Sequence, residues 1–344
     1  MVKNYNLATE ITMEDKFAKI IQKYLEKQPV IILGTGATIP YGIPSMPELA
    51  NHLKVSIDGN STEWNSFLFA LEKTGDLEKA LQSTQIGPAL TNKIIIGTWE
   101  FVNQKDLAYY KNLVDEKEKN FPLKELFLKL LQSHPKHVKV ITTNYDRVAE
   151  YAADLAEANI YTGFSGRYLL NFTQNYFQSL PNQNRVDIWK VHGSLDWFNR
   201  KNHLSFSSPL AKEIPENTMP LIVTPGIIKY QQTHLEPYRT VMNEADNALM
   251  QASCFLCIGY GFNDEHVQPK LLGQVQKGKP IVTIVKKLTE TGKVLLLKNS
   301  AKSIVLEEGE SNKTSLHYFE DNEYKTETMD GNFWQLGEFL NLWL

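Results

Sequence analysis

His192, which precedes Gly193, is the side chain of this sequence best suited to move a proton near neutral pH. Residues 187–192 alternate polar and apolar side chains, a pattern that predicts a β-strand with His192 at its end. The glycine would let a ligand or a loop approach the ring closely. A lone histidine is more often a structural residue than a catalyst, so the neighbours of His192 decide between these two interpretations.

Asn144 and Asp146 form a second polar group, directly after the strand predicted at residues 137–142. Both residue types are common where a strand gives way to a helix. An asparagine there caps the helix or adopts the left-handed conformation, and an aspartate caps the following helix, here predicted at 147–158. Taken singly, each residue is explained by such a structural role. Their joint spacing with the preceding threonines, Thr-x-Asn-x-Asp, is the feature that favours a site.

Two glycine-rich turns are candidate phosphate-binding segments. Residues 34–38 (GTGAT) follow the apolar strand predicted at 29–33, and residues 259–262 (GYGF) follow another. A small-residue turn between a strand and a helix offers backbone N–H groups to an anion and lets a phosphate come close. The usual dinucleotide fingerprint has a third glycine where this chain has Ile39. A tight turn without a ligand, or a cap of the next helix, also explains these residues.

Predicted strands alternate with helical stretches along the chain, and this alternation predicts a parallel sheet covered by helices. The strands are expected at residues 29–33, 137–142, 187–192, 221–224, 254–259 and 280–285. In such α/β sheets, ligands bind beyond the carboxyl ends of the strands, where the histidine, the asparagine and both glycine turns stand. We therefore expect a Rossmann-like α/β fold with one site at that edge of the sheet.

Residues 57–135, approximately, show helical rather than strand patterns and predict a helical insertion between the first two core strands, with Asp76 capping one helix. No linker or internal repeat divides the sequence, so we expect a single domain over residues 1–344. Residues 286–331 are polar and give no assignment. Apolar residues at 332–344, two tryptophans among them, predict a terminal helix docked on the core, with an oligomer contact as the alternative.

Composition argues against several classes of protein. The chain has 344 residues, 22% of them charged, a net charge of −3 and no basic stripe, so nothing favours direct nucleic-acid binding. No apolar run reaches ~18 residues, and no signal peptide opens the sequence, so we expect a cytoplasmic protein without membrane contact. Cys254 and Cys257 stand in an apolar strand with their side chains on opposite faces, which favours two core cysteines over half a zinc site or a redox pair.

Longer stretches of the sequence resemble the sirtuins. The first nucleotide-binding motif of that family reads Gly-Ala-Gly-x-Ser, three residues, then Gly-Ile-Pro. The positions that match it without a gap are Gly34, Gly36, Thr38, Gly42, Ile43 and Pro44. Protein-deacylating sirtuins continue with Asp-Phe-Arg, whereas this chain has Ser45-Met46-Pro47, and it lacks the four zinc-binding cysteines of those enzymes. Both departures disfavour acyl-lysine chemistry.

Three later motifs follow in sirtuin order. Residues 142–146 resemble the family's Thr-Gln-Asn-Ile-Asp, in which the Asn holds the ribose and the attacking water and the Asp supports the site. His192-Gly193 resembles the family's His-Gly, whose His is the general base, and residues 259–264 take the place of its phosphate-contact loop. The four motifs span residues 31–264 and imply a sirtuin-like NAD+-binding domain.

The zinc-free bacterial branch of sirtuin-like proteins is the most similar, and its members hydrolyse NAD+ in anti-phage defence. Glu48-Leu49 after the Gly-Ile-Pro segment suits that branch. The chain length resembles that of the subunit that assembles with a HerA-type hexameric ATPase. The resemblance therefore implies NAD+ as substrate, no metal, a homo-oligomer and a HerA-type ATPase as partner.

The resulting hypothesis is an NAD+ glycohydrolase that releases nicotinamide and ADP-ribose and depletes NAD+ in abortive infection. The expected catalytic residues are Asn144 and His192. The expected cofactor-binding residues are Gly34, Gly36, Ala37, Thr38, Pro44, Thr143, Asp146, Gly259, Gly261 and Phe262. Two alternatives stay open: a sirtuin-type NAD-dependent protein deacylase, and a non-catalytic subunit that binds NAD+ or ADP-ribose within a larger assembly.

Overall fold

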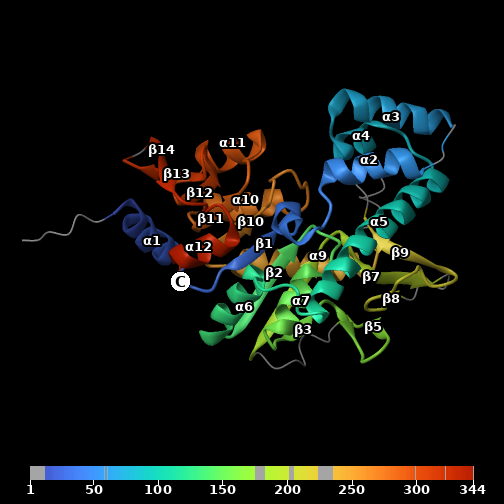
Figure 1. The fold of residues 1–344 in the computed structure, drawn as a ribbon, viewed down its shortest axis with the longest axis horizontal. Helices are drawn as coiled ribbons and strands as arrows, with labels where there is room; N and C mark the ends of the chain where they lie inside the picture. Colours follow the sequence, from blue (N-terminus) through green and yellow to red (C-terminus); the bar gives the residue numbers. More distant parts are fainter. Residues whose placement is uncertain are drawn as a thin grey trace, which may run out of the picture.

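The computed structural model describes residues 12–57, 59, 61–174, 183–200, 205–223, 235–298, 300–321 and 323–343. Its centre is a nine-stranded sheet with the order β14-β13-β12-β11-β10-β1-β2-β6-β3 (Figure 1). The strands are β1 Val30–Leu33, β2 His137–Thr142, β3 Asn159–Tyr161, β6 Arg185–Lys190, β10 Phe255–Ile258, β11 Ile281–Val285, β12 Ser303–Glu308, β13 Lys313–Glu320 and β14 Glu323–Asp330.

The seven strands from β12 to β3 run parallel, whereas β13 and β14 continue the sheet as antiparallel hairpin strands. From β1 the chain builds one half of the sheet through β2, and later builds the other half through β10. The order therefore reverses between β1 and β10, and ligands of α/β sheets bind at such a switch point. The predicted Rossmann-like α/β sheet is confirmed.

Helices cover both faces of this sheet, as the alternation of side chains along β1 shows. Ile31 and Leu33 belong to one core cluster, and Val30 and Ile32 belong to another. The first cluster includes buried residues of the helices between residues 46 and 114 and of α1 Met13–Tyr24, α6 Pro122–Gln132, α7 Val148–Leu155 and α12 Leu336–Trp343. Those that join the second are α9 Tyr238–Gln251, α10 Gln268–Gln276 and α11 Glu290–Lys298. A strand buried on both faces must be apolar at every position, which explains the sequence of β1.

The interval between β1 and β2 is helical, as predicted. Its helices are α2 Met46–Ser56, α3 Thr62–Thr74, α4 Leu77–Ser83, α5 Pro88–Val114 and α6. The Asp76 carboxylate accepts hydrogen bonds from two backbone N–H groups of α4, so the predicted cap is confirmed. In Figure 1, α2, α3 and α4 form a separate group, and the long α5 runs from this group to the carboxyl ends of the strands.

A second, five-stranded antiparallel sheet was not expected from the sequence. Its order is β4-β5-β8-β7-β9, with β4 Phe164–Ser165, β5 Leu170–Phe172, β8 Ser205–Ser207, β7 Gly193–Arg200 and β9 Thr218–Ile222. The strand predicted at 221–224 therefore starts earlier and pairs with β7 in this sheet, and residue 224 lies outside the described residues. Three of the five strands have three residues or fewer, too short for an alternating pattern to stand out.

The described residues toward the C-terminus also form defined elements. The unassigned stretch at 286–331 contains α11 and the strands β12 to β14. Phe339 and Trp343 of α12 are buried in the core, so the predicted docking of the terminal helix is confirmed.

Cys254 and Cys257 are free, buried and in different core clusters, as predicted for core cysteines. No helix among the described residues is long and apolar enough to span a membrane.

Candidate functional site

The turn after β1 differs from the expected strand–turn–helix. Two short 3₁₀ turns, η1 Thr35–Ala37 and η2 Ile39–Tyr41, follow β1, and α2 begins only at Met46. The N–H of Gly36 donates to Gly259 O at 3.1 Å, and the N–H groups of Ala37 and Thr38 donate to oxygens within the same turn. Three of the amides expected to face an anion are thus bonded within the protein.

The glycines of the two turns make room for backbone. A Cβ on Gly34 would lie 2.4 Å from Gly259 O, and a Cβ on Gly259 would lie 2.2 Å from Ala37 N. Gly259 also has φ +58°, a conformation that suits glycine. The strand ends at the switch point therefore touch directly. Gly36 is exposed to solvent where the two turns meet. Pro44, which was also predicted to bind the cofactor, is buried just before α2 begins.

Asn144 joins the ends of β1 and β2. Its Nδ2 donates to Gly34 O at 3.0 Å and to Thr38 Oγ1 at 3.2 Å, and its backbone N–H donates to Thr142 Oγ1 at 3.0 Å. The backbone N–H of Thr143, a half-buried residue, donates to Leu33 O. Asn144 Oδ1 is buried without a hydrogen-bond partner. An unsatisfied amide oxygen fixed in this way is costly unless a ligand or a water satisfies it.

Asp146 is linked to Asn144 through the hydroxyl of Thr38. Thr38 Oγ1 donates to Asp146 Oδ2 at 3.0 Å, and Val148 N donates to Oδ1 at 3.2 Å. Asp146 was expected as the N-cap of the following helix, but α7 starts one residue later than predicted and its N-cap is Arg147. Burial raises the pKa of Asp146 to about 6, while the neighbouring Lys190 opposes the rise. The fully buried Lys190 ammonium donates to Asp146 O and to Glu150 Oε1.

His192 follows β6 by two residues, so the predicted strand ends earlier, at Lys190. Its Nε2 lies 2.8 Å from Oδ2 of Asp264, and the side chains are only 11% and 6% exposed. The two atoms are within salt-bridge distance, and Nε2 makes no hydrogen bond of good geometry. Gly193 makes room for another segment of the protein, one of the two expected uses of this glycine, because a Cβ there would lie 1.9 Å from Leu221 O of β9.

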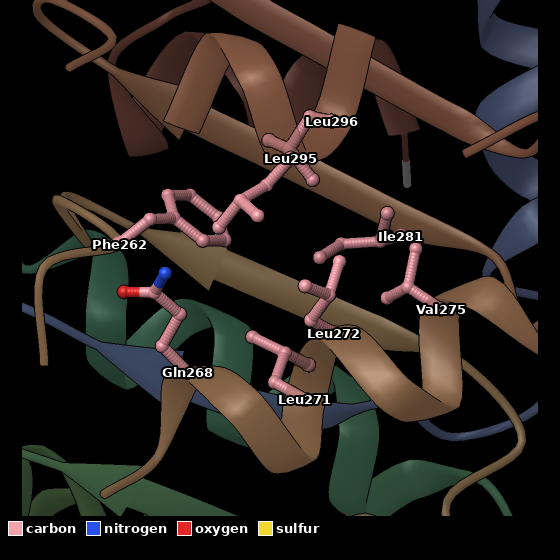
Figure 2. A pocket seen from close by; sticks show the side chains of 8 residues that line it. All are labelled: Phe262, Gln268, Leu271, Leu272, Val275, Ile281, Leu295 and Leu296. Atoms are coloured by element: carbon pink, nitrogen blue, oxygen red, sulfur yellow. The ribbon is translucent and has the colours of Figure 1, made fainter. Parts of the chain in front are cut away.

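Phe262 and Gly261 lie in the loop between β10 and α10. The Phe262 ring points into an apolar cavity lined by α10, α11 and β11, as Figure 2 shows. The Phe262 side chain is thus part of the core. Only its backbone, with φ +57°, lies near the carboxyl ends of the strands. Gly261 O accepts from Thr289 Oγ1, which ties this loop to the segment before α11.

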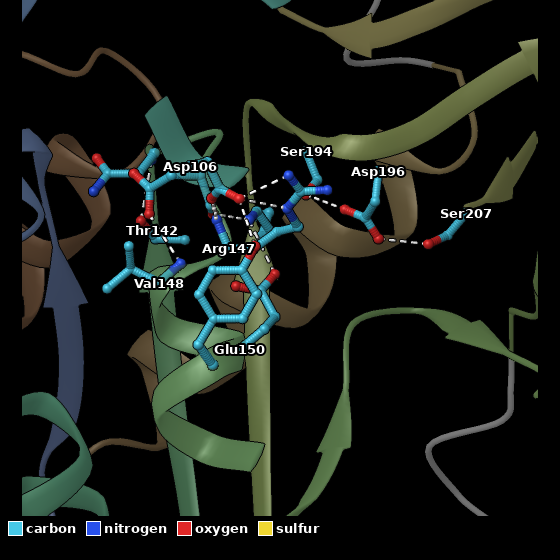
Figure 3. Close-up of polar contacts among 12 residues, drawn as sticks. Asp106, Thr142, Arg147, Val148, Glu150, Ser194, Asp196 and Ser207 are labelled. Atoms are coloured by element: carbon cyan, nitrogen blue, oxygen red, sulfur yellow. Dashed lines mark hydrogen bonds and ion pairs between the residues drawn. The ribbon is translucent and has the colours of Figure 1, made fainter. Parts of the chain in front are cut away.

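The helix α5 holds the loop that carries Asn144 (Figure 3). Asp106 of α5 accepts from the backbone N–H of Arg147 at 2.7 Å and from its guanidinium at 2.7 and 2.9 Å. Trp99 Nε1 of α5 donates to Leu195 O in β7 at 2.7 Å. Burial, and then the negative charges of Glu78 and Asp264, raise the pKa of Tyr145 in this loop.

Two residues of this region were not selected from the sequence. Asp264 is the last residue of the glycine-rich segment 259–264, and only its contact with His192 in the structure distinguishes it as a candidate site residue. Asp106 stood in a helical pattern, and its buried position, 0% exposed, was not signalled by any motif. Aspartate is seldom buried without a partner, so the burial of an aspartate on a helix indicates that it makes an important contact. This burial is visible only in the structure.

The structure brings some of the predicted residues together at the carboxyl ends of the strands. Gly34, Thr38, Asn144 and Asp146 form one hydrogen-bonded group, and the backbone of Gly259 adjoins it. Residues 138–280 match the SIR2-like domain. The match covers less than half of the chain, yet it contains Asn144 and both residues of the His192–Asp264 contact.

Solved Sir2 structures resemble the chain at low identity. A Sir2 homologue in complex with NAD is 14% identical, over 83% of this chain and 87% of that chain, with a TM-score of 0.45. A mutant Sir2 homologue in complex with ADP-ribose is 17% identical, over 83% and 89%, with a TM-score of 0.47. No curated protein matches the chain.

Proposed function

We propose that this protein is an NAD+ glycohydrolase. The observation that carries the proposal is the buried Asn144, whose Oδ1 has no hydrogen-bond partner and stands at the end of β2, beside the switch point. His192 follows β6, the neighbouring strand, and supplies a proton acceptor at the same edge. The SIR2-like match over residues 138–280 contains both residues and supports NAD+ as the substrate.

In the proposed reaction, NAD+ lies across the strand ends with its pyrophosphate over the contact between Gly36 and Gly259. The bond between nicotinamide and C1′ of the ribose breaks through an oxocarbenium-like state, and neutral nicotinamide leaves. Asn144 Oδ1 orients the ribose and the attacking water. The water oxygen bonds to C1′, and His192 takes the proton that the water loses, so that ADP-ribose forms. The leaving group is already cationic in NAD+, so the reaction requires neither a metal nor a protein nucleophile.

NAD+ consumption by the purified chain tests this proposal. His192→Ala should reduce turnover by at least ~10²-fold, the usual contribution of a general base, while its circular dichroism stays that of the wild type. His134→Ala is the matched control. His134 is exposed and precedes β2, so it lies at the amino ends of the strands, away from the proposed site. Equal NAD+ loss in the wild type and His192→Ala would overturn the role of His192.

The same assay separates the alternatives. Nicotinamide release that requires an acylated peptide would favour a protein deacylase. Calorimetry that shows NAD+ or ADP-ribose binding, without turnover under any condition, would favour a non-catalytic binding subunit.

We further propose that the reaction depletes NAD+ in the cytoplasm of phage-infected cells. A constitutive NAD+ hydrolase would be toxic, so activity would be restrained by homo-oligomerisation or by a HerA-type hexameric ATPase. Both ideas rest on the resemblance of the motifs. Adding lysate from phage-infected cells, or the purified ATPase, should then raise NAD+ consumption by the wild type and not by His192→Ala.

A further inference from the structure

The loop between β10 and α10 crosses the strand ends to reach His192. Asp264 belongs to this loop, whereas His192 follows β6, and β1 and β2 lie between β10 and β6 in the sheet. Neighbouring strands are ~4.8 Å apart, so the loop bridges a span of roughly 14 Å. A contact of 2.8 Å between Asp264 Oδ2 and His192 Nε2 at the end of this span joins residues that the strand order alone would separate.

Asp264 is held firmly in this position. Its Oδ1 accepts hydrogen bonds from the backbone N–H groups of His266 at 3.0 Å and Val267 at 2.8 Å, which leaves Oδ2 facing the histidine. The loop is also tied at Gly261, whose oxygen accepts from Thr289, and by the Phe262 ring buried between α10 and α11 (Figure 2). Because the loop is anchored on both sides of Asp264, the carboxylate can orient the imidazole ring of His192 that it contacts.

We propose that Asp264 is a positioning residue for His192. The carboxylate orients the ring and keeps the proton on Nε2, so that Nδ1 carries the lone pair that accepts a proton from the substrate side. The aspartate of serine-protease triads acts in this way on its histidine. A slight rotation of the imidazole would align the N–H of Nε2 with Oδ2, because the two atoms are already within hydrogen-bond distance. This inference rests on the proposed role of His192.

Asp264→Asn is the informative variant. The asparagine keeps its one oxygen for the N–H groups of His266 and Val267, so it presents an NH₂ donor to His192 in place of the carboxylate oxygen. We expect kcat for NAD+ to fall by at least ~10²-fold with little change in KM, because a misoriented base affects the chemical step rather than binding. Asp264→Glu should restore part of the rate. Glu265→Gln, at the exposed neighbouring position, is the matched control.

Histidine nitrogen NMR tests the same inference without any turnover. The His192 signals are assigned by their absence in His192→Ala. The wild type should show the proton on Nε2, and Asp264→Asn should show a changed tautomer or a mixture. The same tautomer in both proteins would overturn the inference, even where NAD+ hydrolysis is intact. A wild type that does not consume NAD+ but shows the expected tautomer change would instead overturn the proposed function alone.

Discussion

Asp106 of α5 accepts three hydrogen bonds from Arg147, one from its backbone N–H and two from its guanidinium, in a place where both side chains are almost fully buried. Tyr151 donates to the same carboxylate at 2.5 Å, and Asn103 Oδ1 accepts from Arg147 Nη2, which also donates to Asp106, at 2.6 Å. Arg147 follows Asn144 by three residues. The insertion therefore fixes the loop that carries Asn144 through a buried ion pair rather than through apolar packing alone.

Asp106→Asn should lower the free energy of unfolding by about 3 kcal/mol, because removing one partner of a buried ion pair leaves the other charge uncompensated. Urea denaturation at pH 7 measures the loss. Asp115→Asn is the control: Asp115 pairs with Lys111 near the end of the same helix, but the Lys111 side chain is 72% exposed, so no measurable change is expected. Equal stability of the two variants would contradict the role given to Asp106.

The buried carboxyl of Asp146 predicts a dependence of stability on pH. Burial raises its pKa to about 6 from an ordinary 3.8, so the folded protein holds this proton more tightly than the unfolded chain does. The resulting stabilisation is complete below about pH 4 and is lost as the pH rises through about 6. Asp146→Asn lacks the ionisation, so its stability relative to the wild type should increase between pH 4 and 7, on the order of 2 kcal/mol.

Denaturant titrations of the wild type and Asp146→Asn at several pH values measure this difference. The asparagine can still accept from Val148 N, so this hydrogen bond at the start of α7 is retained. A stability difference that is the same at every pH would show that Asp146 is ionised in the folded protein throughout this range.

Gly259→Ala should be strongly destabilising, by at least about 3 kcal/mol, since the new Cβ would meet Ala37 N and the C atom of Gly36 in a left-handed conformation. Gly273→Ala is the matched control. Gly273 lies within α10, and no atom stands within 4 Å of the place that a Cβ would take, so the alanine should stabilise the protein by about 0.5–1 kcal/mol. Thermal melting compares the two, and similar melting temperatures would refute the proposed backbone contact.

The sequence was sufficient to predict where Asn144 and His192 lie, because parallel strands place their carboxyl ends at one edge and both residues follow such strands. It was not sufficient to explain the glycines. At Gly34, Gly193 and Gly259, the backbone of another segment lies where a Cβ would be. The sequence alone does not show which segment packs against each of these turns. Asp264 could not be assigned for the same reason, since its loop crosses two strands. The second sheet was missed because its strands are short.

Both free edges of the nine-stranded sheet are poorly suited to pairing with another strand. At one edge, β14 presents Glu323, Lys325 and Glu327 along its eight residues, and at the other, β3 has only three residues. Short strands and charged side chains are the features by which edge strands avoid aggregation. Copies of this protein are thus discouraged from joining these nine-stranded sheets edge to edge into a continuous one, and an ordered assembly would have to use other surfaces.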